Sequence, residues 1–324
     1  MRGNLWAVTT YYNPAGYRLR LKNYRVFRAH LGVPLLTVEL SVSGHYELEE
    51  TDADVLIRIP ATSVLWQKER LLNVGLDHLP QEAKFIAWVD CDVIFDEQGW
   101  FKQIPLVLSD YPVAQLYSEI VDLMKDGSSA SASGLIGHSV VCTERLCPKA
   151  PDNFGLPGAK RTRRGAFGGA WAGRRELLQE HGFYDAMIVG GGDRAFACAC
   201  YGHFQDAITS SRMSKSRADH YLRWATPVYE AIAARVGLVE GRLLHLWHGN
   251  LKDRRYIERH DDLSTFEFNP SSDLRKNKAG AWEWTHTSDR SLQDMVKQYF
   301  ELRNEDGPAP LDQAPRLGGP PSSE

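Results

Sequence analysis

The stretch KFIAWVDCDVIFDE, residues 84–97, carries two carboxylates directly after an apolar run. Residues 85–89 are continuously apolar, as in a strand that is buried on both faces, and Asp90 and Asp92 follow in a polar turn. Carboxylate oxygens are ligands that hard divalent cations prefer. An Asp-x-Asp turn at the end of a buried strand can therefore hold such a cation against a nucleotide diphosphate. That chemistry would make the protein a sugar-transferring enzyme.

Two histidines, His245 and His248, stand three residues apart in HLWHG, at the end of an apolar run. A regular strand would place them on opposite faces, but a turn between them would present both imidazoles to one ion. The alternative is two ordinary polar residues that flank a core Trp247, which is the commoner outcome for an isolated pair. The upstream Asp-x-Asp favours the metal interpretation.

Asp193 follows three glycines in VGGGDRAF, at the predicted start of a helix. A carboxylate at that place can serve as a catalytic base, although the residues taken alone favour a helix cap. A second glycine segment, residues 167–185, begins with FGG, which permits close approach of the backbone, and continues into a short helix. Both segments are candidates for the wall of a ligand site.

The elements that must position these residues alternate between strands and helices. Apolar spacing and β-branched runs predict strands at 5–10, 33–40, 54–59 and 85–89, and helices at 17–31, closed by Gly32, and at 64–78, capped by Ser63. The second helix carries Arg70 and Asn73 on one face. This order predicts a parallel α/β sheet, in which ligands bind at the carboxyl ends of the strands.

The later part of the chain is less regular. We expect helices at 98–109, 216–236 and 290–303, and strands at 113–117 and 243–247. Residues 125–165, rich in Gly, Ser and Pro, are expected to form a long loop or small insertion, serving either acceptor recognition or surface decoration. The proline-rich tail, residues 305–324, is expected to be disordered.

Composition limits the class of protein. The chain has 324 residues, 43% hydrophobic and 24% charged, which is ordinary for a soluble globular protein with one large core. The net charge of -3 gives no global reason to expect nucleic acid or an anionic membrane as partner. No secretion signal and no run of about 18 apolar residues occurs, so we expect a cytoplasmic location. Five cysteines are an odd number, which favours reduced thiols over a set of disulfides. Cys142 and Cys147 lack the second pair of ligands that a zinc site needs.

Taken together, five segments resemble a known pattern. These are WQKERLLNVGL, FIAWVDCDVIF, FGGAW with RRELLQEHGFYD, GGGD and HLWHG, in this order. They are similar to the catalytic domain of metal-dependent glycosyltransferases of the GT-A fold, most of all to the beta-1,4-galactosyltransferase family and related bacterial family-two enzymes. The resemblance covers about residues 5–256, which places the catalytic domain at residues 1–256. It implies a Rossmann-like, mostly parallel central sheet flanked by helices, a small acceptor-side subregion, and a C-terminal helical extension at 257–304.

The resemblance also implies roles for single residues. Asp92, His245 and His248 would bind the metal, with Asp90 contacting the ribose or the metal, and Asp193 would be the general base. Mixed oxygen and nitrogen ligands suit Mn²⁺, with Mg²⁺ less favoured. The remaining contacts to the nucleotide sugar would come from Thr9, Thr10, Tyr11, Arg70, Asn73, Gly168 and Gly169.

The activity implied is inverting transfer of a sugar from a nucleotide-diphosphate donor, with UDP as the default, to an acceptor hydroxyl. The chain departs from the family at residues 187–189, where the family has a tryptophan-rich lid, and at Gly192, which replaces an acidic residue. We therefore expect the acceptor to be held differently.

Three alternatives stay open. A nucleotidyltransferase acting on sugar phosphates would share the sheet and the metal carboxylates, but the chain lacks a glycine-rich phosphate loop with Lys near its N-terminus. A non-catalytic sugar-nucleotide-binding module would not need Asp193. Within the transferase interpretation, an anionic acceptor, such as a modified nucleic acid or a lipid phosphate, is a further alternative. It is suggested by the basic stretch 160–164 and by the cluster Arg212, Lys215 and Arg217. A solvated basic surface is the commoner explanation of such clusters.

Overall fold

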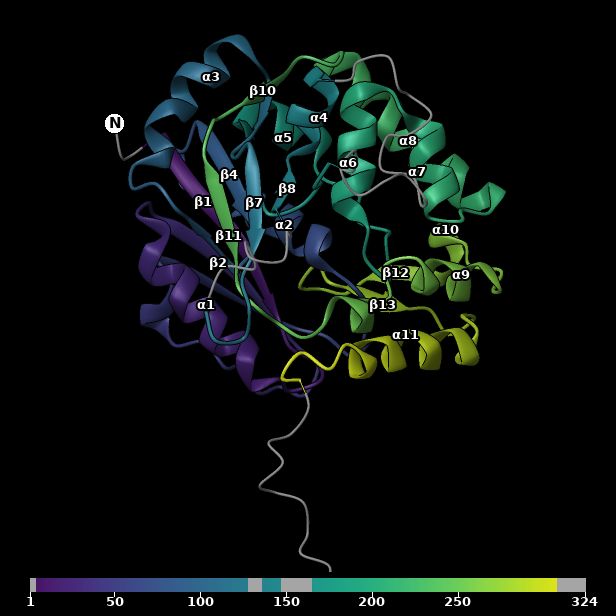
Figure 1. The fold of residues 1–324 in the computed structure, drawn as a ribbon. Coiled ribbons are helices and arrows are strands. Elements are labelled where there is room, and N and C mark those ends of the chain that lie inside the picture. The colour runs from purple at the N-terminus through teal and green to yellow at the C-terminus, as the bar shows by residue number, and fades with distance from the viewer. Residues whose placement is uncertain (1–3, 128–135, 147–164, 308–324) are drawn as a thin grey trace, which may run out of the picture.

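The computed structural model describes residues 4–127, 136–146 and 165–307, and its centre is a seven-stranded sheet (Figure 1). The strands are β1 (Leu5–Tyr12), β2 (Leu35–Ser41), β3 (Val55–Pro60), β4 (Phe85–Val89), β6 (Val113–Gln115), β9 (Ala170–Arg174) and β10 (Val236–Leu238). Their order is β10-β6-β9-β4-β1-β2-β3. β9 runs antiparallel to both neighbours and the other pairings are parallel. The prediction of a mostly parallel α/β sheet is confirmed.

Helices cover both faces of this sheet, because its strands carry apolar side chains on alternate sides. Ala87 and Val89 of β4 belong to one core cluster, and Ile86 and Trp88 belong to another. The first cluster takes in α1 (Arg18–Leu31) and α3 (Ile104–Asp110). The second takes in α2 (Lys68–Asp77), α5 (Arg175–His181), α6 (Gly192–Tyr201) and α8 (Lys215–Ile232). Figure 1 shows α1 and α6 on opposite sides of the strands.

A second, four-stranded sheet lies at one end of the first. It contains β5 (Val93–Phe95), β11 (Arg242–His245), β7 (Glu119–Asp122) and β8 (Ile136–His138), in the order β5-β11-β7-β8. β11 pairs antiparallel with β5 and parallel with β7. The strand that follows the Asp-x-Asp turn therefore lies next to the strand that ends in the first histidine.

The remaining elements are short or C-terminal. They are 3₁₀ helices at Glu50–Asp52, Trp100–Gln103 and Leu251–Arg254, helices α4 (Val140–Leu146), α7 (Phe204–Ser210), α9 (Glu258–Ser264), α10 (Pro270–Asp273) and α11 (Arg290–Leu302), and a hairpin of β12 (Leu274–Lys276) and β13 (Trp282–Trp284). Phe268, Trp284 and Phe300 are buried in the same core cluster as α2 and α6. The C-terminal segment thus packs against the α/β part.

Three local predictions were wrong. Helix α2 begins at Lys68 rather than Val64, and Ser63 does not cap it, because the Ser63 hydroxyl accepts a hydrogen bond from the Trp284 amide at 3.1 Å. The helix expected at 98–109 is a 3₁₀ turn followed by α3. Strand β9 was not predicted, because AWAGR has small residues on both faces and no alternation.

The tail was predicted to begin at residue 305, but Glu305 is 1% exposed and forms ion pairs with Arg20 and Arg303. The folded part therefore continues to at least Gly307.

Residues 308–324, the basic stretch 160–164 and Cys147 lie outside the described residues. Among the described residues, Cys91, Cys198 and Cys200 are free thiols. No helix in the described part of the chain has both the length and the apolarity to cross a bilayer.

Candidate metal and sugar-nucleotide site

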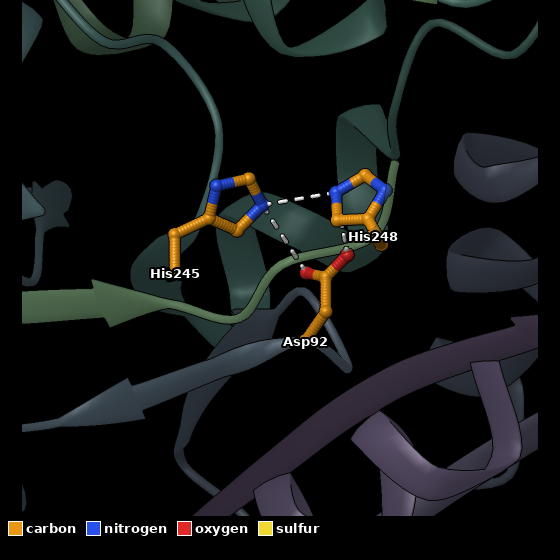
Figure 2. A group of neighbouring side chains, drawn as sticks. All are labelled: Asp92, His245 and His248. Atoms are coloured by element: carbon orange, nitrogen blue, oxygen red, sulfur yellow. Dashed lines mark hydrogen bonds and ion pairs between the residues drawn. The ribbon is translucent and has the colours of Figure 1, made fainter. Parts of the chain in front are cut away.

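Asp92, His245 and His248 converge on one point (Figure 2). The Nε2 atom of His248 lies 3.2 Å from Asp92 Oδ2 and 3.2 Å from His245 Nε2, and His245 Nε2 lies 3.8 Å from Asp92 Oδ1. Ligand atoms that share an ion at about 2.1 Å are about 3.0 to 3.4 Å apart at octahedral or tetrahedral angles. Two of the three separations fall in this range and the third is longer, so the three side chains lie close enough to share a divalent cation.

A turn after β11 brings the two histidines to the same side. The strand ends at His245, and the Leu246 amide then donates to the Asp92 carbonyl at 2.8 Å, which ties the turn to the Asp-x-Asp loop. The chain thereby avoids the opposite faces that a regular strand would impose. The turn required by the metal interpretation is present.

The environment of His248 keeps it available as a metal ligand. Burial lowers the pKa of His248 well below its usual range, and the charge of Arg254 lowers it further, so the ring is neutral and keeps a lone pair for a metal. Burial raises the pKa of Asp92, which His245 opposes. A partly buried carboxylate beside two imidazole nitrogens is a position that a cation would stabilise.

A fourth residue, Asp122, orients His245. Its Oδ1 atom lies 2.7 Å from His245 Nδ1, and a carboxylate only accepts hydrogen bonds, so Nδ1 carries the proton and Nε2 faces the triad as an acceptor. Carboxylates in this outer position fix the tautomer of metal-binding histidines. The sequence analysis missed Asp122, since only the pairing of β7 with β11 places it opposite His245.

A second cluster lies on the other side of the Asp-x-Asp turn and centres on Lys68. Its Nζ atom is 2.5 Å from Asp90 Oδ1 and 2.8 Å from Asp193 Oδ1. Burial disfavours the charge on Lys68, but Asp193 and Asp90 together outweigh it and raise its pKa well above the usual value. Asp90 thus faces Lys68, and the metal-capable group within the described residues includes Asp92 and not Asp90. Sequence reasoning did not single out Lys68.

Asp193 does not cap its helix. The N-cap of α6 is Gly191, and both carboxylate oxygens of Asp193 accept hydrogen bonds from Lys68, at 2.8 and 3.0 Å. The side chain remains 29% exposed. Burial raises its pKa and Lys68 opposes the shift, while Asp90 adds to it. The cap interpretation is therefore wrong, and the carboxylate is available to a ligand.

The two glycines of the FGG segment form the floor between these carboxylates. The Gly169 amide donates to Asp90 Oδ2 at 3.0 Å. A Cβ atom at Gly168 would lie 2.9 Å from Asp193 Oδ2 and 3.4 Å from Asp90 Oδ2. Glycine is needed at position 168 because the backbone passes directly under both acids. The predicted role of both glycines in nucleotide-sugar binding stays a prediction.

Glu69 lies beside this cluster, and its carboxyl contacts the glycine run before Asp193. A Cβ atom at Gly192 would lie 2.0 Å from Glu69 Oε1, so only glycine fits there. Burial raises the pKa of Glu69 to about 8, opposed by Lys68. The carboxyl is thus largely protonated at neutral pH, and it packs against α6 without adding a full charge.

Other residues predicted to bind the nucleotide have partners within the protein. Arg70 Nη1 donates to Asp185 Oδ2 at 2.8 Å, and Asn73 bonds Asp185 and the backbone of Phe183. These contacts hold α2 to the segment before α6. Nucleotide contact by either side chain stays a prediction.

The first strand is longer than predicted. β1 continues through Tyr12, two residues beyond the predicted end, so Tyr11 also lies within the strand. The Thr9 hydroxyl donates to the Val89 carbonyl at 2.6 Å and the Tyr11 hydroxyl to Glu47, while Thr10 is partly exposed. Thr9 thereby braces the end of β4 just before Asp90.

The basic cluster of Arg212, Lys215 and Arg217, which suggested an anionic acceptor, is not an open patch. Arg212 pairs with Asp261 and Lys215 pairs with Asp219, both at the surface. Arg217 is 3% exposed and donates to the Arg212 carbonyl. This cluster therefore does not support an anionic acceptor.

No protein-family model matches the chain, and no curated protein matches it by sequence. Solved structures similar to it include TarS of S. aureus in complex with UDP-GlcNAc, at 10% identity and a TM-score of 0.38, covering 93% of this chain and 72% of that chain. Another is a mutant of Drosophila β1,4-galactosyltransferase 7 with manganese, UDP-Gal and xylobiose, at 12% identity and a TM-score of 0.38, covering 90% and 98%.

A third is 4-diphosphocytidyl-2C-methyl-D-erythritol synthase from Anaerococcus prevotii, at 7% identity and a TM-score of 0.30, covering 74% and 90%. The galactosyltransferase is of the family that the motifs of this sequence resemble. At these identities and TM-scores the likenesses establish neither family nor function.

Proposed function

We propose that this protein is an inverting glycosyltransferase that moves a sugar from a nucleotide-diphosphate donor, with UDP as the first candidate, to an acceptor hydroxyl. The observation that carries the proposal is the pairing of two sites across one turn. Asp92, His245 and His248 form a metal-capable triad, and Asp193 offers a partly exposed carboxylate beside Asp90. Sugar transfer with inversion needs these two functions, one at the leaving group and one at the acceptor.

The triad would hold the metal, and Mn²⁺ is our first candidate because the ligands mix one oxygen and two imidazole nitrogens. When bound, a divalent cation supplies positive charge that offsets the charge on a departing diphosphate. Asp122 keeps His245 Nε2 directed at the triad.

The chain's own residues then supply the acid–base chemistry. Asp193 accepts the proton of the acceptor hydroxyl while the oxygen bonds to the anomeric carbon and the bond from that carbon to the diphosphate breaks. A base works best when its pKa approaches the working pH, and burial raises the pKa of Asp193 in that direction, against Lys68. Lys68 keeps the carboxylate in place at 2.8 Å.

The proposal is tested with a panel of nucleotide sugars, each in Mn²⁺ or in a chelator, following donor hydrolysis and thermal shift. We expect at least one donor to stabilise the protein only when the metal is present, and a nucleoside diphosphate to be released. Absence of any metal-dependent response would overturn the proposal. Release of pyrophosphate from a nucleoside triphosphate and a sugar phosphate would instead show nucleotidyl transfer.

The role of Asp193 is tested by Asp193→Asn, with Asp219→Asn as a control at an exposed carboxylate of α8. Loss of a general base removes about 10² to 10⁴ in turnover. We expect that loss in Asp193→Asn with donor affinity largely kept, and no change in the control. Turnover that survives the substitution would remove Asp193 from the base role.

A further inference from the structure

Two arginines that follow the metal histidines are buried without a carboxylate. Arg254 is 6% exposed and Arg259 is 7% exposed. Neither makes an ion pair within the described residues, and each guanidinium donates one hydrogen bond there, Arg254 Nη1 to the Tyr256 hydroxyl at 3.0 Å and Arg259 Nη1 to the Tyr299 hydroxyl at 2.7 Å. The Nε atom of each is buried with no partner in that part of the chain.

Of the other buried arginines in the described residues, Arg217 also lacks a carboxylate partner and donates to the Arg212 carbonyl, whereas two are paired. Arg70 bonds Asp185, and Arg303 bonds Glu305. A buried guanidinium has five donors, and burial of a charge is costly unless it is paired and hydrogen-bonded. Arg254 and Arg259 therefore have donors left for an anion from outside the protein.

Both arginines contact the same side chain, Tyr256. Arg254 bonds the Tyr256 hydroxyl, and the Arg259 guanidinium lies 5.2 Å from the centroid of the Tyr256 ring. Tyr256 is 51% exposed, so the two guanidinium groups lie directly beside a side chain at the surface. Tyr299 joins them from α11, because its hydroxyl contacts Arg259 and the Arg254 carbonyl.

The pair also spans the two halves of the candidate site. The charge of Arg254 acts on Asp92 and His248, and that of Arg259 acts on Asp193. Arg259 packs against the glycine run before Asp193, since a Cβ atom at Gly190 would lie 2.9 Å from its Nη1. The guanidinium of Arg259 is therefore on the side of the proposed base.

We propose that Arg254 and Arg259 bind an oxyanion, a phosphate or carboxylate group, that belongs to the acceptor. The binding of an oxyanion stands without the proposed glycosyltransferase activity, whereas its assignment to the acceptor rests on that activity. Arg259 would hold the anion beside Asp193, and Arg254 would hold it toward the metal triad. Guanidinium forks match the geometry of both oxyanions. The acceptor class is thus a hydroxyl compound that carries a negative charge.

Binding is tested with inorganic phosphate in the presence of a chelator, which removes the metal as a second place for phosphate. Thermal shift is measured against chloride at matched ionic strength, for the wild type, Arg254→Gln, Arg259→Gln and the control Arg212→Gln at the exposed Asp261 pair. We expect phosphate to stabilise the wild type and the control, and each of the first two variants to lose at least tenfold in phosphate affinity. Equal affinity in all four proteins, or no stabilisation beyond chloride, overturns the site.

The same variants separate a binding role from a structural one. An arginine that is needed for folding lowers the melting temperature when replaced, whereas removal of an unpaired buried charge is expected to leave it unchanged or raise it without ligand. Should a glutamine variant fail to fold, Arg259→Lys keeps the charge but loses the fork. We expect it to bind phosphate at least threefold more weakly, and unchanged affinity would overturn the proposal.

The source of the oxyanion is tested with UDP and Mn²⁺ by calorimetry. If the group belongs to the acceptor, Arg259→Gln keeps the UDP affinity of the wild type while it loses phosphate binding. A tenfold loss of UDP affinity in Arg259→Gln would overturn the acceptor assignment, because the anion would then be the donor's diphosphate. The phosphate measurement needs no donor, so it remains valid if the protein proves not to be a glycosyltransferase.

Discussion

Each half of the candidate site depends on one charged side chain that holds a functional group in position. Asp122 fixes the tautomer of His245 through a contact of 2.7 Å, and Lys68 pairs with both Asp90 and Asp193. Neither residue binds the metal or takes the acceptor proton in the proposed reaction. Their effect on activity passes through the groups they hold.

For Asp122 we predict that Asp122→Asn weakens Mn²⁺ binding by about 10- to 100-fold, as outer carboxylates of metal-binding histidines do. An amide can donate to Nδ1, which would move the proton of His245 onto Nε2, the nitrogen that faces the metal position, and so block it as a ligand. Calorimetric titration with Mn²⁺ measures the effect. Asp96→Asn, at an exposed pair with Arg242, is the control, and equal Mn²⁺ affinity in both variants would contradict the prediction.

Glu69 makes the stability of the protein depend on pH. Its pKa is raised from 4.5 to about 8 by burial, so between these values the folded protein holds a proton that the unfolded chain has lost. The free energy of unfolding then falls as pH rises through this window. We predict that Glu69→Gln removes this part of the slope, which urea unfolding between about pH 5 and 8 measures. A slope that persists in the variant would assign it to another group.

At the scale of elements, the site is assembled where strands end. β4 delivers Asp90 and Asp92, and β9 lies beside β4 so that Gly168 and Gly169 meet Asp90. β11 delivers His245 into register with Asp122 of β7. The functional side chains therefore lie close together only if both sheets keep their register.

A methyl group at the junction of β9 with the site tests this arrangement. We predict that Gly168→Ala lowers turnover at least tenfold while the fold is kept, because the added Cβ would lie 2.9 Å from Asp193 Oδ2. Gly173→Ala, in the adjoining strand β9 and against Leu178, is the matched control. Steady-state kinetics and circular dichroism on both variants decide the question. Full activity in Gly168→Ala would show that Asp193 can move freely.

At the scale of the whole molecule, a buried charge network joins the two ends of the described chain. Glu305, after α11, bonds Arg303 and reaches Arg20 of α1 at 2.6 Å. Burial raises the pKa of Glu305, but Arg20 and Arg303 outweigh it and lower the value to about 2. The network places the C-terminal segment against the first helix.

We predict that Glu305→Gln lowers the free energy of unfolding by about 3 to 5 kcal/mol, the usual effect of removing one partner of a buried ion pair. Since the pKa is depressed on folding, the stabilisation is present above about pH 4.5 and is lost as pH falls towards 2. Glu301→Gln, at an exposed position of α11, serves as the control in urea unfolding. Equal stability of the two variants would show that the network contributes nothing.

Residue type and short spacing were sufficient to single out Asp92, His245, His248 and Asp193 as candidates, and to predict β4 with the bounds that the structure has. These features are local, because a buried strand, a turn after it and a carboxylate at a helix start each leave a pattern within a few residues. The sequence also determined the α/β class, through the alternation of its strands and helices.

Only the tertiary structure decided which partners these residues have. Asp122 is 123 residues from His245, and Lys68 is 125 residues from Asp193, so no local pattern connects them. The same holds for Glu305 and Arg20, which the sequence analysis placed in a disordered tail and a helix. Pairing of strands and packing of helices bring such residues together, and these depend on the whole core rather than on the spacing along the chain.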